Sequence, residues 1–270
     1  MMNILLPTDF SENSRNAAAY ALQFFKDTPC NFHLLHVIPA PADKLATGYI
    51  AMSPAVKDNF EKLLLWLESI RTNPDHNFYT CFKTDYLINA VREKVREKQI
   101  DLILMGTKGK TNKEGVVIGN NTSDVMMKVK CPVLAISEHA SFKEHRKILF
   151  PTDYKIHYGS NVLRTLLNLA SLSKANVKIL EIFNNEYEPS FEQIENREYL
   201  QDAFSPRIPV LQTYYTSKEQ NPRKILVTNR DIDMIVLAAK NLNLCRKFLK
   251  NEENENIPFI NQLPLLVLHG

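Results

Sequence analysis

The stretch Asp101-Leu102-Ile103-Leu104-Met105-Gly106-Thr107-Lys108-Gly109-Lys110 decides the fold, because an apolar run typical of a buried strand ends in it abruptly at a glycine. A third glycine, Gly119, stands where a helical segment begins. Glycines let backbone amides approach an anion closely, and a helix N-terminus offers unpaired N–H donors with a partial positive charge. Three lysines outnumber one glutamate along this loop: Lys108, Lys110, Lys113 and Glu114. We therefore expect an anion site here, for a nucleotide.

The chain repeats itself once, and the same three anchors return in the same order. Asn3–Phe10 returns as Lys147–Tyr154, Ile100–Leu104 as Ile232–Val236, and Cys131–Leu134 as Leu263–Leu266. A length of 270 residues suits two domains of ordinary size. We expect domains at 1–139 and 146–270, joined through a short polar stretch at 137–145.

Each copy alternates strands with helices. In the first copy, short apolar strands are expected at 3–7, 32–38, 78–82, 101–105 and 133–136. Helices are expected after Ser11 as N-cap, from Val56 to Ile70, from Leu87 to Val95 and from Asn120 to Lys128. This alternation predicts an α/β fold of two tandem Rossmann-like domains, each an open five-stranded parallel sheet with helices on both faces.

Three polar features fall at the carboxyl ends of strands, where open parallel sheets bind ligands. They are Pro7-Thr8-Asp9, Ile38-Pro39 and the glycine loop. The Asp9 carboxylate is expected to accept hydrogen bonds from a ribose or a base, and backbone groups near Ile38 to read an adenine edge. The competing interpretation of Asp9 is helix capping, a role that Ser11 could fill equally well.

Composition excludes several classes of protein. A net charge of +3 predicts no nucleic-acid partner, and no apolar run is long enough to span a membrane. The N-terminus is too short in apolar residues for a signal peptide, and four widely spaced cysteines indicate reduced thiols, so we expect a cytoplasmic protein. His33 and His36 should point to opposite faces of a strand, which disfavours a metal site. A Walker A loop would need glycine at position 104, where Leu104 stands.

The spacing Gly106-x2-Gly109-x9-Gly119, the opening Leu-Pro-Thr-Asp, the Asp-Leu-Ile-Leu-Met-Gly strand and the closing Cys-Pro-Val-Leu together resemble the universal stress protein family over nearly the whole chain. The resemblance implies an adenine nucleotide, ATP or AMP, with or without Mg²⁺. Asn120 stands where ATP-binding members of the family have Ser or Thr, and Lys108 where they commonly have His. The implied nucleotide-binding residues are Pro7, Thr8, Asp9, Ile38, Met105, Gly106, Lys108, Gly109, Gly119, Asn120, Asn121 and Thr122.

The second copy keeps its apolar pattern but loses the loop. The two later anchors are both offset by 132 residues. Applying this offset to the loop pairs Gly106, Gly109 and Gly119 with Ala238, Asn241 and Asn251, so the second copy has no glycine at these positions. The acidic run at 251–256 would then oppose an anion. We expect this domain to be structural, binding no nucleotide triphosphate.

The resemblance also implies a regulatory role rather than an enzymatic one. It implies that the last strands, Val133–Ile136 and Leu265–Leu268, pair within the chain, with association of two tandem chains and a protein partner as further expectations. Glu114 and Asp124 are the acids near the loop, and both are expected to be surface charges. Two alternatives stay open: an interaction scaffold that binds no nucleotide, and a slow ATP hydrolase.

Overall fold

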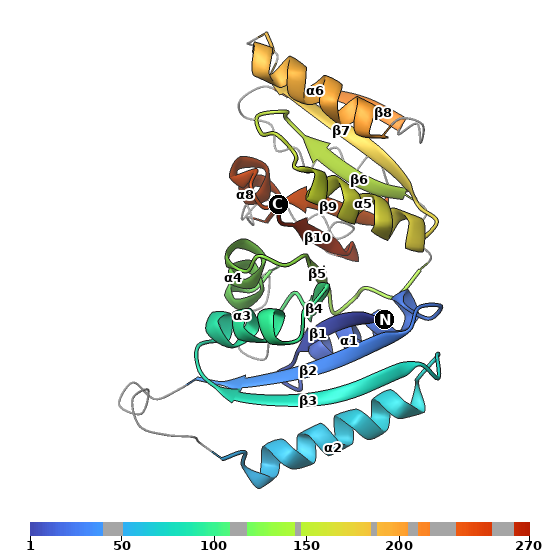
Figure 1. Ribbon diagram of the computed structural model, residues 1–270, viewed down its shortest axis with the longest axis vertical. Coiled ribbons are helices and arrows are strands. Elements are labelled where there is room, and N and C mark those ends of the chain that lie inside the picture. The colour runs from blue at the N-terminus through green and yellow to red at the C-terminus, as the bar shows by residue number, and fades with distance from the viewer. Residues whose placement is uncertain are drawn as a thin grey trace. The chain divides into compact units, whose positions relative to one another are not determined.

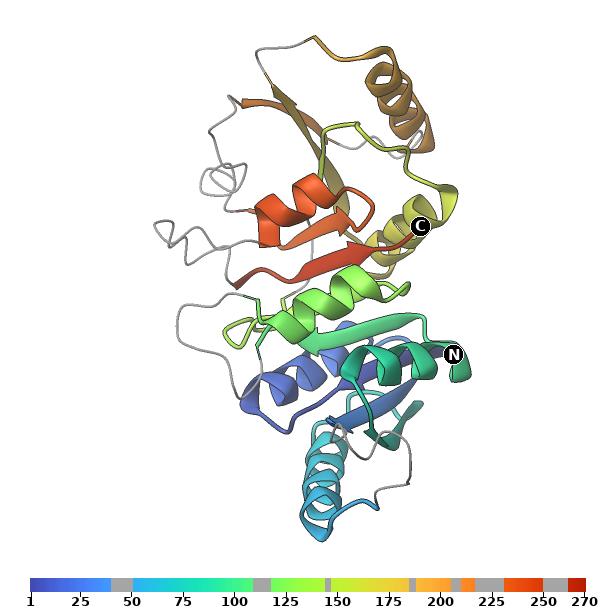
Figure 2. The same ribbon diagram turned by 90° about the vertical axis from the view of Figure 1, so that its left-hand side faces the viewer.

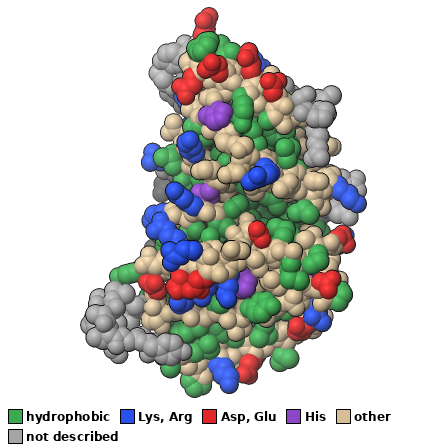
Figure 3. All heavy atoms as spheres, viewed as in Figure 1, with side chains coloured by type: hydrophobic (Ala, Val, Ile, Leu, Met, Phe, Trp, Pro, Cys, Tyr) green, Lys and Arg blue, Asp and Glu red, His purple; other side chains and the backbone are tan. Residues whose placement is uncertain are grey.

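The computed structural model describes residues 1–39, 51–108, 118–143, 147–184, 188–204, 210–216, 231–249 and 262–270. These residues form two compact units, Met1–Phe142 and Lys143–Gly270. Strands alternate with helices along the first unit, and along the second unit as far as it is described outside 217–230 (Figures 1 and 2). Basic and acidic side chains are interspersed on the face of the described residues that Figure 3 shows. None of the described helices is long and apolar enough to cross a membrane.

The first unit is a parallel sheet in the order β3-β2-β1-β4-β5. The chain leaves β1 toward β2 and β3, and then returns to the other side of β1 for β4 and β5. The carboxyl ends of β1 and β4 therefore flank the point where the strand order reverses. The elements are β1 (Met2–Pro7), α1 (Glu12–Phe24), β2 (Cys30–Ile38), α2 (Pro54–Ser69), β3 (His76–Thr84), α3 (Leu87–Glu97), β4 (Leu102–Gly106), α4 (Asn120–Lys128) and β5 (Val133–Ile136).

Local sequence accounts for these elements. All five residues of β4 are buried, as a continuous apolar run in a parallel sheet requires. Helix α1 begins after Ser11, whose Oγ accepts the Ser14 amide proton at 3.2 Å. The predicted N-cap at Ser11 is confirmed. Helix α2 begins in the same way after Ser53, with proline in its first turn.

The second unit has the same topology, in the order β8-β7-β6-β9-β10, with all strands parallel. The predicted fold class is confirmed. The pairing expected between the last strands of the two units stays a prediction. The elements are β6 (Lys147–Thr152), α5 (Ser160–Leu172), β7 (Asn176–Asn184), α6 (Phe191–Phe204), β8 (Val210–Thr216), β9 (Met234–Ala238), α8 (Leu242–Leu249) and β10 (Leu265–Leu268).

One detail of the predicted repeat is wrong. Helix α8 begins directly after Asn241, which caps it: the Leu244 amide donates to Asn241 Oδ1 at 3.1 Å. Asn241 is therefore the counterpart of Gly119, the N-cap residue of α4, and Asn251 is not. The second unit connects its strand to its helix through three residues, where the first unit has a long loop. The acidic run at 251–256, which we expected near the phosphate site, follows α8 in the chain and lies outside the described residues.

Candidate functional site

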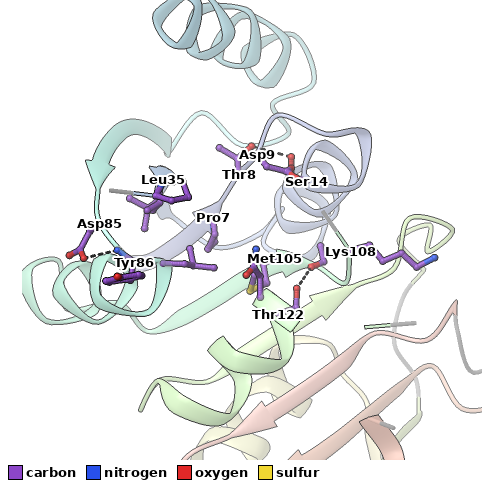
Figure 4. Close-up of a pocket in the computed structure, with 15 residues that line it drawn as sticks. Pro7, Thr8, Asp9, Ser14, Leu35, Asp85, Tyr86, Met105, Lys108 and Thr122 are labelled. Atoms are coloured by element: carbon purple, nitrogen blue, oxygen red, sulfur yellow. Dashed lines mark hydrogen bonds between the residues drawn. The ribbon is translucent and has the colours of Figure 1, made fainter. Parts of the chain in front are cut away.

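A pocket of about 310 Å³ opens at the carboxyl ends of the strands of the first unit (Figure 4). Its lining contains the predicted residues Pro7, Thr8, Asp9, Met105, Gly106, Lys108, Asn121 and Thr122. Ile38, Gly119 and Asn120 flank it without lining it. Gly109 lies outside the described residues, as do Lys110, Lys113 and Glu114. The pocket therefore brings the end of β1, the end of β4 and the start of α4 to one place.

The wall at the end of β1 is a hydrogen-bonded turn. Asp9 Oδ1 accepts the amide proton of Ser11 at 3.0 Å and its hydroxyl proton at 2.5 Å. Since Ser11 is the N-cap of α1, Asp9 does not fill that role. Phe10 between them has a φ of 60°, a left-handed conformation that turns the chain sharply. The turn holds the Asp9 side chain at the pocket wall.

The wall at the end of β2 is apolar. Leu35, Val37 and Pro39 line the pocket, whereas Ile38 does not. Successive side chains along a strand point to opposite faces, so Val37 and Pro39 face the pocket and Ile38 between them faces away. The Ile38 carbonyl accepts the Asp85 amide proton at 3.1 Å, at the end of the β2–β3 ladder. We expected backbone groups near Ile38 to read an adenine edge, and one of them, the Ile38 carbonyl, already has a backbone partner.

Gly106 makes room for a neighbouring side chain. A Cβ at this position would meet Asn13 side-chain atoms at 2.8, 2.9 and 3.0 Å. Asn13 is buried and donates from Nδ2 to the Lys108 carbonyl at 2.8 Å, while its Oδ1 has no hydrogen-bond partner among the described residues. Glycine at 106 is therefore required for this packing, whatever it also does for a ligand.

The N-terminus of α4 faces the pocket without a cap. Gly119 donates its amide proton to the Thr107 carbonyl at 2.7 Å, and Thr122 Oγ1 donates to the Gly106 carbonyl at 2.8 Å. No side chain caps the helix, and the amides of residues 120–122 have no acceptor among the described residues. These amides carry the partial positive charge of a helix start and remain available to an anion.

Charge in the described lining is mixed. Asp9 and Asp85 contribute carboxylates, and Lys108 contributes an amine. Lys108 Nζ donates to Glu138 Oε1 at 3.1 Å, and Figure 4 shows its side chain extending away from the pocket. Lys108 would therefore have to leave Glu138 before it could contact a phosphate.

Our sequence reasoning missed part of the lining. The missed residues are Ser14, Leu35, Val37, Pro39, Asp85, Tyr86 and Leu87. Three of these follow β3, and the rule that ligands bind at the carboxyl ends of parallel strands would have found them had it been applied to that strand too. Ser14 carries no signal of its own, because it reaches the pocket only through the first turn of α1.

At the corresponding edge of the second unit, described side chains contact one another where the first unit has its pocket. Thr8 Oγ1 lies 3.0 Å from Ser14 Oγ in the first unit, and at the matching positions the Tyr158 hydroxyl donates to Thr152 Oγ1 at 2.8 Å. Tyr158 is buried, which raises the pKa of its hydroxyl. A phenol ring thus stands where the first unit has a serine.

Further polar contacts lie at this edge. Asn241 Nδ2 donates to Asp153 Oδ1 at 2.7 Å, so the counterpart of Asp9 is satisfied within the unit. Beside it, the fully buried Glu181 carboxylate accepts from the Tyr154 hydroxyl at 2.8 Å and from Arg197 Nε at 2.8 Å. These groups satisfy one another, as buried polar groups must.

The two strand histidines lie on opposite faces, as expected from alternation. The His36 ring is 6.3 Å from that of Phe60 on α2. His33 is buried near Lys94 and Lys98, at the α3 side, and burial together with these lysines lowers its pKa. Within the described residues, no group of three or more His, Cys, Asp or Glu side chains could hold a metal ion.

Comparison with known proteins gives a consistent result. The model of the universal stress protein family matches residues 1–72 and 84–137. Two universal stress proteins of Methanocaldococcus jannaschii are 25% and 27% identical to this chain over 138 and 155 residues. Those alignments take in 50% and 51% of this chain, and 81% and 96% of the relatives.

Solved structures match the whole length. A universal stress protein from Archaeoglobus fulgidus DSM 4304 is similar with a TM-score of 0.62 and 15% identity, over 99% of this chain and 96% of that one. A putative universal stress protein from Pseudomonas aeruginosa UCBPP-PA14 is similar with a TM-score of 0.56 and 14% identity, over 100% of this chain and 93% of that one. These matches show that the tandem fold occurs in other chains of this size.

Proposed function

Because this chain belongs to the universal stress protein family, whose members often bind adenine nucleotides, we propose that its first unit binds ATP or AMP as a stress-response regulator. The second unit serves as a structural partner domain that holds no nucleotide triphosphate. The observation that carries the proposal is the difference between the units at the same edge of the same sheet. One has a pocket with an uncapped helix N-terminus, and the other has Tyr158 and Asn241 in that place.

The residues present suit an adenine nucleotide. The volume lies within the usual range for small-molecule sites, and flat apolar walls flanked by a few polar groups are typical of them. The amides of residues 120–122 would receive the phosphates, as helix starts do in other nucleotide sites. Asn120 has a side-chain amide that can donate to a phosphate oxygen, as the Ser or Thr of other members can. Asp9 would accept from the ribose hydroxyls.

A magnesium ion would enter with the nucleotide. Magnesium is commonly bound through phosphates and one or two carboxylates, with water completing its shell. Of the two carboxylates in the described lining, Asp9 follows β1, the strand next to β4, whereas Asp85 follows β3 at the far edge of the sheet. Magnesium bound with ATP would also relieve repulsion between the Asp9 carboxylate and the phosphates.

Two glycines provide a matched test. Gly119 and Gly159 are both helix N-cap residues in extended conformation, with φ and ψ of −71° and 159° in the first case and −59° and 151° in the second. A Cβ at Gly159 meets nothing within 4 Å. Gly159→Val therefore controls for the effect of valine at an N-cap without touching the pocket.

We expect Gly119→Val to weaken ATP binding at least about tenfold in calorimetry, because a branched side chain obstructs the approach of phosphates to α4. Gly159→Val should bind like the parent protein. Titrations with and without Mg²⁺, and with AMP in place of ATP, separate the two nucleotides. A parent protein that carries no nucleotide through purification and binds neither ATP nor AMP would favour the scaffold alternative. Steady ATP turnover above background would instead favour the hydrolase.

A further inference from the structure

The far end of the pocket carries the carboxylate of Asp85, a residue that the sequence did not single out. Asp85 follows β3, the strand farthest from the N-terminus of α4 in this sheet order. Neighbouring strands lie about 4.8 Å apart, so three intervals place the β3 edge about 14 Å from the β4 edge. A ligand whose anionic group sits at α4 must be elongated to reach Asp85.

The two carboxylate oxygens of Asp85 differ in their contacts. Oδ1 accepts the Tyr86 amide proton at 2.6 Å and an Asn89 Nδ2 proton at 3.2 Å. The amide of Asp85 itself is fixed on the Ile38 carbonyl at 3.1 Å. Oδ2 has no hydrogen-bond partner among the described residues, although Asp85 is half-buried and lines the pocket. The side chain is thus held through Oδ1, and Oδ2 remains available as an acceptor.

The surroundings of Asp85 suit a flat ring. Val37, Pro39 and Leu87 supply apolar surface, and Tyr86 is 57% exposed at the rim, so an aromatic face is available for stacking. An ionised carboxylate accepts hydrogen bonds but donates none, so it favours a ring that carries a hydrogen-bond donor. Figure 4 shows Asp85 and Tyr86 together at one end of the pocket, apart from Asp9 and Ser14.

We propose that Asp85 is the residue that selects the base, accepting a hydrogen bond from the exocyclic amine of adenine through Oδ2 while Tyr86 covers the ring. This inference rests on the proposed nucleotide function and adds its base specificity. The hydrogen bond from the Asp85 amide to the Ile38 carbonyl fixes the Asp85 backbone beside the end of β2, so its side chain can read the same edge of the base. A purine with a carbonyl in place of the amine would set two acceptors against each other and be rejected.

Asp85→Asn reverses the selection while keeping the shape of the side chain. With its oxygen still accepting from the Tyr86 amide, the new side chain turns an N–H donor toward the ligand. The control is Asp75→Asn, which removes one charge from an exposed residue just before β3, at the opposite edge of the sheet. Fluorescence of Trp66, the sole tryptophan and part of α2, checks that the first unit of each variant is folded.

The measurement is the ratio of dissociation constants for inosine triphosphate and ATP. The parent and Asp75→Asn should prefer ATP, and Asp85→Asn should lower this preference about tenfold or more, through weaker ATP binding and unchanged or tighter inosine triphosphate binding. Equal weakening of both nucleotides by Asp85→Asn would overturn the inference, since it would mean contact with the ribose or a general charge effect. An unchanged ratio would also overturn it and leave the nucleotide function standing. A parent that binds neither nucleotide would overturn both.

Discussion

Replacing Gly106 by alanine tests whether the glycine serves packing or only the ligand. Its φ lies outside the left-handed region, so an alanine backbone is tolerated there. The obstacle is Asn13, whose side-chain atoms would lie 2.8 to 3.0 Å from the new methyl group. To relieve this clash, Asn13 must move, and it then loses its 2.8 Å hydrogen bond to the Lys108 carbonyl.

The expected cost is the sum of two effects. Overpacking by one methyl group costs about 1 to 3 kcal/mol, and the lost hydrogen bond costs about 1 kcal/mol. Gly106→Ala should therefore destabilise the first unit by about 2 to 4 kcal/mol. Asn13→Ala should cost about 1 kcal/mol, because it loses only the hydrogen bond. In the double variant the methyl group enters space that Asn13 has left, and the hydrogen bond is lost only once, so its cost should be about 1 kcal/mol and fall short of the sum of the single costs by about 2 to 4 kcal/mol.

The assay is urea unfolding followed by Trp66 fluorescence, which reports on the first unit because the chain has no other tryptophan. The midpoint and slope are compared for the parent, both single variants and the double variant. Additive costs, or a Gly106→Ala protein as stable as the parent, would refute the packing argument. The glycine would then have to be explained by ligand contact alone.

Two further predictions concern buried titratable groups. His33 is buried against the Tyr79 ring with neither ring nitrogen hydrogen-bonded among the described residues, and its pKa is lowered in the folded state. In the unfolded chain His33 takes up a proton near pH 6.5, whereas in the folded chain it takes one up only at lower pH. The free energy of unfolding is therefore highest above pH 6.5 and falls as the pH drops below that value. His33→Phe should raise stability at pH 7.5 by about 1 kcal/mol and flatten its decline toward pH 5.5, and an equally steep decline in the variant would exclude His33 as the cause. Ellman's reagent at pH 8 should label Cys81 first in the native protein, because Cys81 is half-buried. Burial raises the pKa of the other three thiols, those of Cys30, Cys131 and Cys245, to about 12, so they should react slowly. Rapid labelling of two or more thiols would contradict this prediction.

The strands and helices of the first unit could be predicted because their signals are local and strong. Asn120–Lys128 and Val133–Ile136 were predicted with the bounds that the structure has. The repeat of Pro-Thr-Asp after both first strands was enough to predict a second unit of the same topology. Such features need only periodicity and order along the chain.

The loop region of the second unit could not be predicted from the same sequence patterns. The residues missing before α8 are balanced by residues added after it, so the anchors on either side keep their spacing while the helix between them moves. Only the capping contact of Asn241 with the Leu244 amide fixes where that helix begins. Capping asparagines look like ordinary polar residues in a sequence when the alignment around them is misplaced.

Side-chain contacts between residues far apart in the sequence could not be predicted either. Asn13 and Gly106 are far apart along the chain, and nothing in either segment indicates that they touch. Lys108 was expected to face phosphates from its position alone, whereas the structure pairs it with Glu138, a residue of the linker region. Spacing predicts which strand end a residue follows, but the direction of a long side chain depends on partners that are brought close by folding.

The Tyr158 ring has a consequence for how the two units respond to their surroundings. A bound molecule stabilises the folded state by an amount that rises with its concentration, whereas a side chain is always present at the same effective concentration. If the first unit binds a nucleotide, its melting temperature should follow the nucleotide supply, and that of the second unit should not. One chain would then contain a unit whose folded stability depends on the nucleotide concentration in the cell and a second unit whose folded stability does not.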